Sequence, residues 1–366
     1  MFERRFRFGP IALALLFTGC VADVAASHGP GPYYVSDFAQ VPKFDAHVHI
    51  NGSPEEFAKA AEASNFSVLT INVDYPDFPS LATQADIAHK AHAAHPKSVQ
   101  YATTFSMAGW GQPGWASGVN THIDEEIKQG AVGVKIWKNV GMAEKDKDGR
   151  LIMIDNPGFD PIVAHIMERH SVLIGHQGEP HNCWLPLEQM TTDNDREYFK
   201  AHPQYHMYLH PDQPSYEDQM QARDRFLARH PRLNFMGAHM ASLEWSVDRL
   251  GQFLDANPSA TIDLAARMTQ VQYQSNRDYE KVRRFFIRYQ DRILYGSDVS
   301  IGPNDNAAEA MAYIKKVWES DWAYLATGES QNIDALKADT RGLALPRQVI
   351  DKIYRKNAQR VFSLKS

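Results

Sequence analysis

Two histidines separated by one residue, His47 and His49, stand in the run KFDAHVHI at residues 43–50. In an extended strand every second residue faces the same side, so Asp45, His47 and His49 are expected to point into one space. The opposite side is expected to carry the apolar residues Phe44, Ala46, Val48 and Ile50. Two imidazoles at the end of one strand can chelate a divalent ion. A surface or core histidine pair is the alternative interpretation at this stage.

Three later runs also end on a residue able to bind a metal. Ile174-Gly175 leads to His176, Gly237-Ala238 leads to His239, and Tyr295-Gly296-Ser297 leads to Asp298. If all these runs are strands of one parallel barrel, their carboxyl ends lie on the same face. The combination therefore predicts one site to which several strands contribute.

A lysine, Lys135, lies in the apolar run 131–138. Alternation places Gly133, Lys135 and Trp137 on the inner face of this expected strand. A buried ammonium is unfavourable unless it is paired, neutralised or modified, so Lys135 is a candidate functional residue. A structural ion pair inside the barrel is the alternative.

The elements needed to position these residues alternate along the chain as strand and helix. Strands are expected at 43–50, 66–74, 99–107, 131–138, 170–178, 233–241, 260–267 and 292–299. Helices are expected at 54–64, 82–94, 123–129, 160–169, 216–229, 245–256, 278–290 and 306–318. Eight such repeats predict an α/β fold, a (β/α)8 TIM barrel. Long βα loops at 108–120, 139–156 and 180–215 are expected on its C-terminal face, and 319–346 is expected to be an insertion.

The composition is that of a globular chain: 43% of the 366 residues are hydrophobic and 22% are charged. The formal net charge of −6 offers no uniform basic field for a nucleic acid, so a small-molecule substrate is the better expectation. The sequence leaves open whether the chain forms a homo-oligomer.

The first residues combine a basic start with the short apolar run 10–17, which is typical of a signal peptide. We expect residues 1–27 to be this signal and residues 28–366 to be the barrel. The protein is then exported to the bacterial periplasm, either as a soluble protein or as a lipoprotein anchored to the membrane through Cys20. After either processing route Cys183 remains as one cysteine, so no internal disulfide is expected.

As an ordered set, these motifs resemble the amidohydrolase superfamily. The resemblance extends over roughly residues 40 to 362, and its motifs are Asp-x-His-x-His at 45–49, Gly-x-Lys at 133–135, His176, Ala-His-Met at 238–240 and Gly-Ser-Asp at 296–298. It is strongest to the amidohydrolase-related branch that includes pyrone dicarboxylate lactonase and aminocarboxymuconate semialdehyde decarboxylase.

The resemblance implies a role for each matching residue. The ligands of a divalent ion, usually zinc, are then His47, His49, His176 and Asp298. His239 is implied to contact the attacking water or the substrate. In binuclear relatives a lysine at the position of Lys135 is carboxylated and bridges two ions. We favour one ion, with Lys135 in an ion pair with Asp298, Asp45 or a substrate carboxylate, and two ions remain the alternative.

The implied chemistry is hydrolysis of a C–O or C–N bond in a lactone, ester or amide, by a water activated on the metal. Asp298 and His239 are the candidate catalytic residues. Arg267 is a candidate clamp for a substrate carboxylate, or else the partner of a loop carboxylate. Trp137 and Glu179 are further candidate substrate-binding residues. Weaker candidates for the pocket wall are His181, Trp184, Tyr208 and His210.

Two other functions compete with hydrolysis. Metal-dependent, non-oxidative decarboxylation of a small carboxylic acid is supported by the same branch with nearly the same ligands. A non-catalytic, exported binding protein is the other alternative. It is disfavoured because His239 and Asp298 supply proton-transfer groups that binding alone does not require.

Overall fold

The computed structural model describes residues 31–364, and the expected signal peptide at 1–27, including Cys20, lies outside them. Nine parallel strands form the main sheet of the described chain, in the order β8-β7-β6-β5-β4-β3-β2-β1-β9. These strands are β1 (Lys43–Ile50), β2 (Phe66–Ile71), β3 (Val99–Thr104), β4 (Gly133–Ile136), β5 (Val172–Gly175), β6 (Phe235–Gly237), β7 (Thr261–Asp263), β8 (Ile293–Leu294) and β9 (Val299–Ile301).

The sheet closes on itself because β8 and β9 are two parts of one chain segment. β8 pairs with β7, and β9 pairs with β1. Between them, the backbone N–H of Ala46 donates to the carbonyl of Tyr295 at 2.9 Å, and the N–H of Asp298 donates to the carbonyl of His47 at 2.8 Å. The result is a barrel of eight strand positions, which confirms the predicted TIM-barrel fold.

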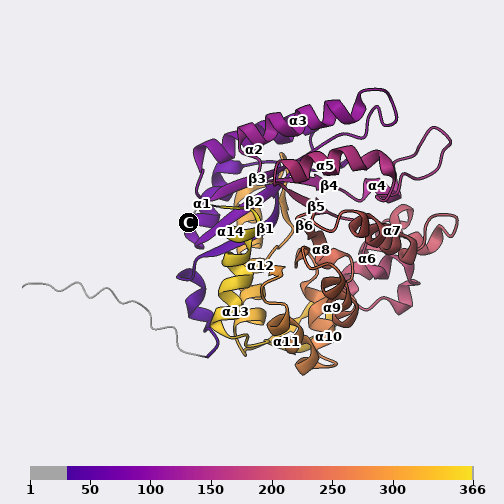
Figure 1. The fold of residues 1–366 in the computed structure, drawn as a ribbon. Helices are drawn as coiled ribbons and strands as arrows, with labels where there is room; N and C mark the ends of the chain where they lie inside the picture. The colour runs from indigo at the N-terminus through magenta and orange to yellow at the C-terminus, as the bar shows by residue number, and fades with distance from the viewer. Residues whose placement is uncertain (1–30, 365–366) are drawn as a thin grey trace, which may run out of the picture.

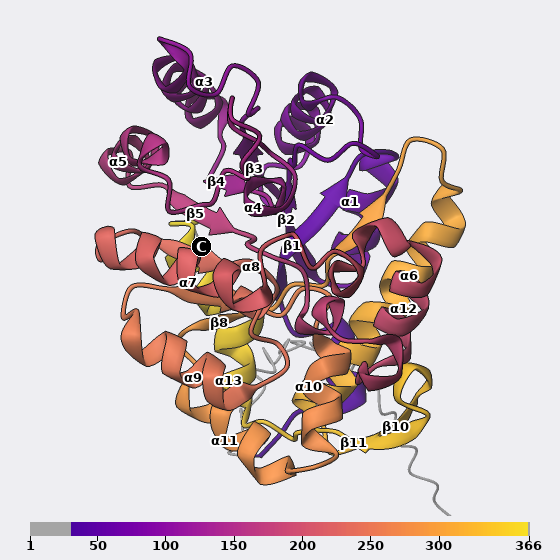
Figure 2. The same cartoon turned by 90° about the vertical axis from the view of Figure 1, so that its right-hand side faces the viewer.

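Helices surround the strands on the outside (Figures 1 and 2). The outer helices are α1 (Pro54–Ala63), α2 (Leu81–Ala94), α3 (Trp115–Gln129), α5 (Asp160–Glu168), α7 (Tyr216–Arg229), α9 (Val247–Ala256), α11 (Tyr279–Arg288) and α12 (Ala307–Ala326). Shorter helices are α4 (Asn139–Met142), α6 (Asp193–Ala201), α8 (Ala238–Ala241), α10 (Met268–Ser275), α13 (Arg347–Asp351) and α14 (Asn357–Val361). A small antiparallel pair, β10 (Ser330–Ile333) and β11 (Ala338–Arg341), follows α12.

The barrel interior is filled by apolar side chains from strands around its whole circumference. They include Phe44, Ala46, Leu69, Ile71, Ala102, Ile174, Met236 and Leu294. Ala358 and Val361 of α14 belong to the same cluster, so this last helix packs against the barrel core. A tightly filled interior leaves the carboxyl ends of the strands as the place for a site.

A bulge in β1 overturns the expected alternation of its side chains. The pairing with β2 shifts register between Asp45 and Val48, which inserts one extra residue into β1. Phe44 and Ala46 therefore pack inside the barrel, whereas Val48 packs in the outer layer. Asp45 faces outward too: Trp318 of α12 donates to its carboxylate at 2.8 Å. The expectation that Asp45 shares a face with the two histidines, and that it can pair with Lys135, is wrong.

All four expected connections are partly helical: 139–156 begins with α4, and 180–215 contains α6. The expected loop at 108–120 ends early because α3 begins at Trp115, and the first part of the expected insertion at 319–346 extends α12 to Ala326. The differences at α3 and α12 lengthen outer helices. The expected strand at 292–299 is divided into β8 and β9, and the expected strand at 233–241 ends at Gly237, where α8 follows.

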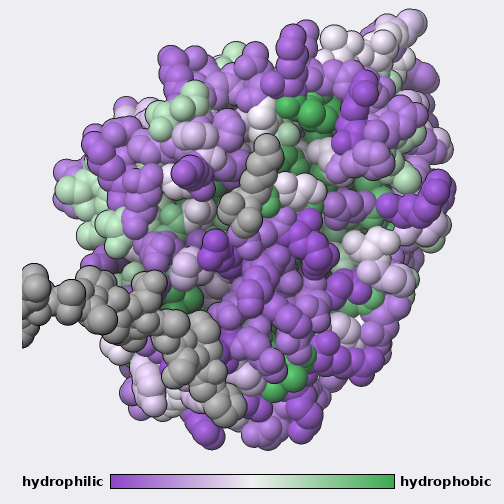
Figure 3. All heavy atoms as spheres, turned by 60° about the vertical axis from the view of Figure 1, so that its left-hand side comes forward, coloured by the Kyte–Doolittle hydropathy of each residue, from purple (hydrophilic) through white to green (hydrophobic). Residues whose placement is uncertain are grey.

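The face shown in Figure 3 is mainly hydrophilic, with small separate hydrophobic areas. Within residues 31–364, no helix combines the length and the apolar character that are needed to span a bilayer.

Candidate functional site

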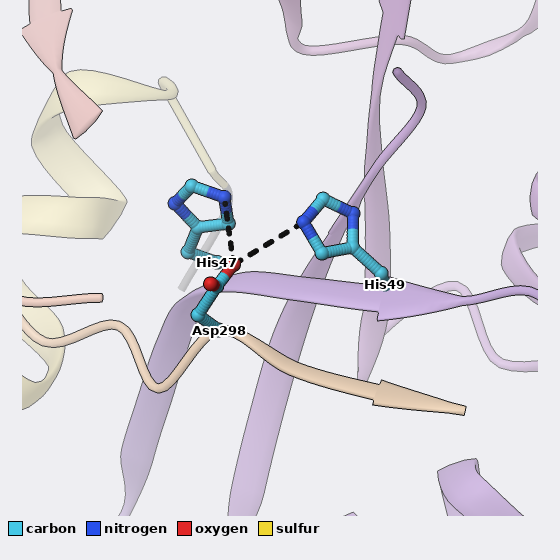
Figure 4. A group of neighbouring side chains, drawn as sticks. All are labelled: His47, His49 and Asp298. Carbon is cyan, nitrogen blue, oxygen red and sulfur yellow. Dashed lines mark ion pairs between the residues drawn. The ribbon is translucent and has the colours of Figure 1, made fainter. Parts of the chain in front are cut away.

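Three side chains converge at the point where the barrel closes. Nε2 of His47 lies 3.4 Å from Oδ1 of Asp298, and Nε2 of His49 lies 3.3 Å from the same oxygen. Figure 4 shows both imidazoles directed at this carboxylate. One ligand atom from each residue lies within 4.8 Å of the others, as in a metal-binding cluster.

The backbone presents Asp298 in an unusual conformation. Asp298 lies in the interruption between β8 and β9 and has a φ of 65°, in the left-handed region. Such a conformation is unfavourable for a residue with a side chain and is common at functional sites. The N–H of Asp298 is held by the carbonyl of His47, so the residue is fixed to the strand that carries the histidines.

Each of three histidines is oriented through its Nδ1 atom. His47 Nδ1 lies 2.8 Å from Oδ2 of Asp263, His49 Nδ1 lies 2.8 Å from the carbonyl of Ile71, and His239 Nδ1 lies 2.9 Å from the carbonyl of Ala265. An acceptor at Nδ1 places the proton there and leaves Nε2 as the free nitrogen. The rings are thus held with Nε2 available for a ligand.

His176 and His239 lie beside this cluster. The ring centroids of His176 and His239 are 4.1 Å apart, and those of His47 and His239 are 4.8 Å apart. Nε2 of His176 is buried and has no hydrogen-bond partner among the described residues, as is also true of Nε2 of His47. Two orphaned imidazole nitrogens in a buried site are what a metal ion would satisfy.

His239 stands in a left-handed turn that follows β6. The φ angles of His239, Met240, Ala241 and Ser242 are 56°, 57°, 52° and 57°. Left-handed backbone costs roughly 1–2 kcal/mol for each residue with a side chain. Oδ1 of Asp263 accepts the backbone N–H of His239 at 2.7 Å and helps to hold this turn. Strain of this kind at a site residue is consistent with a functional constraint on its position.

Burial sets the protonation of the site histidines. Burial lowers the pKa of His47, and it lowers the pKa of His176 and of His239 well below the ordinary value. The charge of Lys135 acts in the same direction on all three. Neutral imidazoles are the form that binds a metal.

Asp298 is expected to be ionised. Burial alone would raise its pKa, but its contacts with His49 and His47, together with the charge of Arg267, hold the pKa below its usual range. The side chain keeps 27% of its surface exposed. A carboxylate that is charged and accessible can serve as a ligand and as a proton acceptor.

Lys135 is buried inside the barrel, as the alternation in β4 predicted, with 1% of its surface exposed. Its Nζ has no hydrogen-bond partner among residues 31–364. Burial lowers the pKa of Lys135 to about 8, although the charges of Asp263 and Asp298 oppose this effect.

All nine predicted site residues line one cavity of about 430 Å³ at the carboxyl ends of the strands. They are His47, His49, Lys135, Trp137, His176, Glu179, His239, Arg267 and Asp298. The weaker candidates His181, Trp184, Tyr208 and His210 are not part of its wall. A larger cavity of about 680 Å³ lies between α2, α3 and β3 and contains none of the nine residues.

The candidate substrate-binding residues differ in how their charges are satisfied. Glu179 forms a short ion pair with Lys138, so its charge is compensated within the protein. Arg267 is 8% exposed and donates to the carbonyl of Ala266 at 3.0 Å, while its Nε has no hydrogen-bond partner in the described chain. No ion pair within residues 31–364 includes Arg267, so the alternative of a loop carboxylate as its partner is not realised there.

Sequence reasoning missed Asp263 and Lys138 as residues of the site. Asp263 lies at the end of β7, and its position at a strand's carboxyl end was a usable signal. Lys138 follows β4 and pairs with a residue that follows β5, which one sequence gives no means to foresee.

The donor set fits a divalent metal. Two atoms bound at 2.0–2.1 Å to a tetrahedral ion are about 3.3–3.4 Å apart, which is the separation between each histidine Nε2 and Asp298 Oδ1. Imidazole nitrogens combined with a carboxylate suit zinc and related transition metals.

Comparison with known proteins agrees with the fold. The chain is similar to an uncharacterized TIM-barrel protein from Bordetella bronchiseptica, with a TM-score of 0.55 and 12% identity over 88% of this chain and 99% of that one. It is also similar to 2,6-dihydroxybenzoate decarboxylase from Rhizobium, with a TM-score of 0.52 and 15% identity over 89% of this chain and 99% of that one. A comparison with curated protein sequences finds no match.

Fold and site together define a TIM-barrel protein with a His-His-Asp cluster suited to a divalent metal. The amidohydrolase family model matches residues 44–364, so the chain belongs to the amidohydrolase family. This match confirms the family resemblance of the sequence motifs.

Proposed function

We propose that the protein is a metal-dependent hydrolase that cleaves a C–O or C–N bond of a lactone, ester or amide. The observation that carries this proposal is the convergence of His47 and His49 on the accessible carboxylate of Asp298, in a cavity at the carboxyl ends of the strands. A bound divalent ion, for which we propose one zinc, would supply an activated water and a Lewis acid for the carbonyl oxygen.

We propose that the ligands of the ion are His47, His49, His176 and Asp298. The first two present Nε2 because Asp263 and the carbonyl of Ile71 occupy their Nδ1 atoms. The orphaned Nε2 of His176 supports its inclusion.

Asp298 would accept the proton of the attacking water, because its low pKa keeps it ionised and part of its side chain remains exposed. His239 would stabilise negative charge on the carbonyl oxygen or pass a proton to the leaving group. Its Nδ1 is fixed by Ala265, which leaves Nε2 for this purpose.

Arg267 would bind a carboxylate of the substrate. Its guanidinium is buried at the cavity, and its Nε lacks a partner in the protein. An anion opposite this group would give its Nε a hydrogen-bond acceptor, which the described protein does not supply. The proposed substrate is therefore a small carboxylic acid that contains a lactone, ester or amide bond.

Non-oxidative decarboxylation is the alternative, because the same histidines and Arg267 could hold a substrate carboxylate near the ion. The likeness to the Rhizobium decarboxylase, at 15% identity, supports the shared fold and leaves the choice of reaction to experiment.

The test is turnover by zinc-loaded protein across lactones, esters, amides and aromatic carboxylates, with carbon dioxide measured in parallel. We expect a hydrolytic product without carbon dioxide, and at least ~10²-fold less of it from Asp298→Asn. The variant Asp334→Asn, in an exposed turn, is the matched control. Release of carbon dioxide in proportion to substrate loss would show that the protein is a decarboxylase and that the hydrolase proposal is wrong.

A further inference from the structure

A second cavity adjoins the metal-site cavity. It has a volume of about 240 Å³ and is named the side chamber here. Five residues line both spaces: Tyr75, Trp137, Lys138, Glu179 and Tyr198. The two spaces therefore adjoin along these five side chains.

Aromatic contacts run from a metal-ligand candidate to the side chamber. The ring of Phe78 lies 5.2 Å from that of His49, Tyr75 lies 5.1 Å from Phe78, and Trp137 lies 4.9 Å from Tyr75. This wall offers ring faces and edges along the whole path.

The lining that the side chamber does not share with the metal-site cavity is mostly apolar or aromatic, with two uncharged amides, Asn139 and Gln204. Met142 of α4 lies there, together with Tyr205 and Met207 from the connection that follows α6. Methionine and tyrosine side chains adapt well to a flat apolar group.

The two charged residues of the side chamber neutralise each other. Lys138 and Glu179 form an ion pair whose side chains are 20% and 10% exposed, and Nζ of Lys138 lies 5.3 Å from the ring centroid of Trp137. A charged ligand group in the side chamber would have to compete with this pair. An uncharged group would leave the pair intact.

We propose that the side chamber binds an uncharged aromatic or apolar group of the substrate, which is joined to the part cleaved in the metal-site cavity. This inference rests on the proposed function, since it places the reacting bond beside Asp298 and the substrate carboxylate at Arg267. A dry cavity of about 150 Å³ is large enough for benzene, so about 240 Å³ accommodates a phenyl ring.

The first test measures binding without catalysis. Zinc-loaded protein is titrated calorimetrically with butanoate and with 4-phenylbutanoate. We expect the phenyl compound to bind at least about tenfold more tightly, because it buries a ring of the size of a phenylalanine side chain. Equal affinities would overturn the proposal.

Two tyrosines in the same connection provide a matched pair of variants. Tyr205 lines the side chamber and is 39% exposed, whereas Tyr208 is 50% exposed and is not part of its wall. We expect Tyr205→Ala to reduce the preference for the phenyl compound at least about threefold, and Tyr208→Ala to leave it unchanged. Met142→Trp, which fills the chamber, is expected to abolish the preference. If the preference for the phenyl compound is unchanged in both Tyr205→Ala and Met142→Trp, the phenyl group does not bind in the side chamber.

Turnover of monomethyl succinate and monomethyl phenylsuccinate, half-esters that keep a free carboxylate for Arg267, separates this inference from the proposed function. If both esters are hydrolysed with equal kcat/KM and no binding preference is found, the side chamber does not bind part of the substrate. The proposal that the protein is a hydrolase would be unaffected. If the variants change the binding preference but no ester, lactone or amide is hydrolysed, the role of the side chamber in binding is supported. The proposal that the protein is a hydrolase would then be wrong.

Discussion

Oδ2 of Asp263 lies 2.8 Å from Nδ1 of His47, and both side chains are fully buried. This contact fixes the ring of the histidine and places its proton on Nδ1, so that Nε2 faces Asp298. The other oxygen of Asp263 accepts the backbone N–H of His239. One carboxylate therefore positions a metal-ligand candidate and a catalytic candidate together.

We expect Asp263→Asn to weaken metal binding by about 10- to 100-fold, the usual effect of removing such a supporting carboxylate. The measurement is a zinc titration against a fluorescent chelator, with Asp334→Asn as the control. Unchanged affinity in a folded Asp263→Asn protein would show that the contact does not support a ligand.

His176 and His239 have neighbouring rings but different predicted roles. We expect His176→Ala to lose the metal, because it removes a ligand, and His239→Asn to retain the metal with at least ~10²-fold lower turnover. Elemental analysis and rate measurements on the same preparations distinguish the two. Loss of metal from His239→Asn would mean that the roles are wrongly assigned.

Lys135 is predicted to keep an unmodified side chain beside a single ion. In the described chain His47, His49 and Asp298 form one convergent cluster with His176 beside it, and a carbamate on lysine would need two cations to stabilise it. We expect one zinc per chain by elemental analysis. We also expect the intact mass, measured under native conditions, to show no carbon dioxide adduct on the protein. Two metal ions per chain, or the added mass of one carbon dioxide, would show that the site is binuclear and that the prediction is wrong.

Asp321 should make the protein less stable as the pH rises. Burial raises the pKa of this carboxyl to about 7, and the hydrogen bond from Tyr295 opposes the effect only in part. The folded state then binds more protons than the unfolded state between pH ~4 and ~7, so the free energy of unfolding decreases across that interval.

The isosteric variant Asp321→Asn should flatten this dependence and stabilise the protein at pH 8, by an amount on the order of a few kcal/mol. Chemical denaturation at pH 5 and pH 8 measures it, with exposed Asp334→Asn as the control. Parallel pH profiles for the wild type and Asp321→Asn would show that Asp321 is not the group responsible.

The fold was predictable because its strands are short apolar runs that recur with helices between them. β1 is found at its predicted bounds, and the residues at the carboxyl ends of the strands line one cavity. Alternation predicted the inward direction of Lys135 correctly. It failed at Asp45, because a bulge depends on pairing between strands that the sequence of one strand does not encode.

Other parts of the site depend on contacts between distant segments. The pair of Lys138 with Glu179 joins the loops after β4 and β5, and the left-handed turn at His239 is held in part by Asp263 on β7. Neither has a local sequence pattern, since no glycine marks the turn. The side chamber likewise arises from loops whose paths are set by packing.

The barrel is completed at the same residues that form the candidate metal cluster. His47 and Asp298 are joined by a backbone hydrogen bond where the last strand position meets the first, and their side chains face each other across that seam. An ion bound by both residues would link the first and last strand positions of the sheet. Its binding free energy would add to the stability of the folded chain. A chain that loses the ion then loses part of its architecture as well as its chemistry, so substitutions at this seam are constrained twice over.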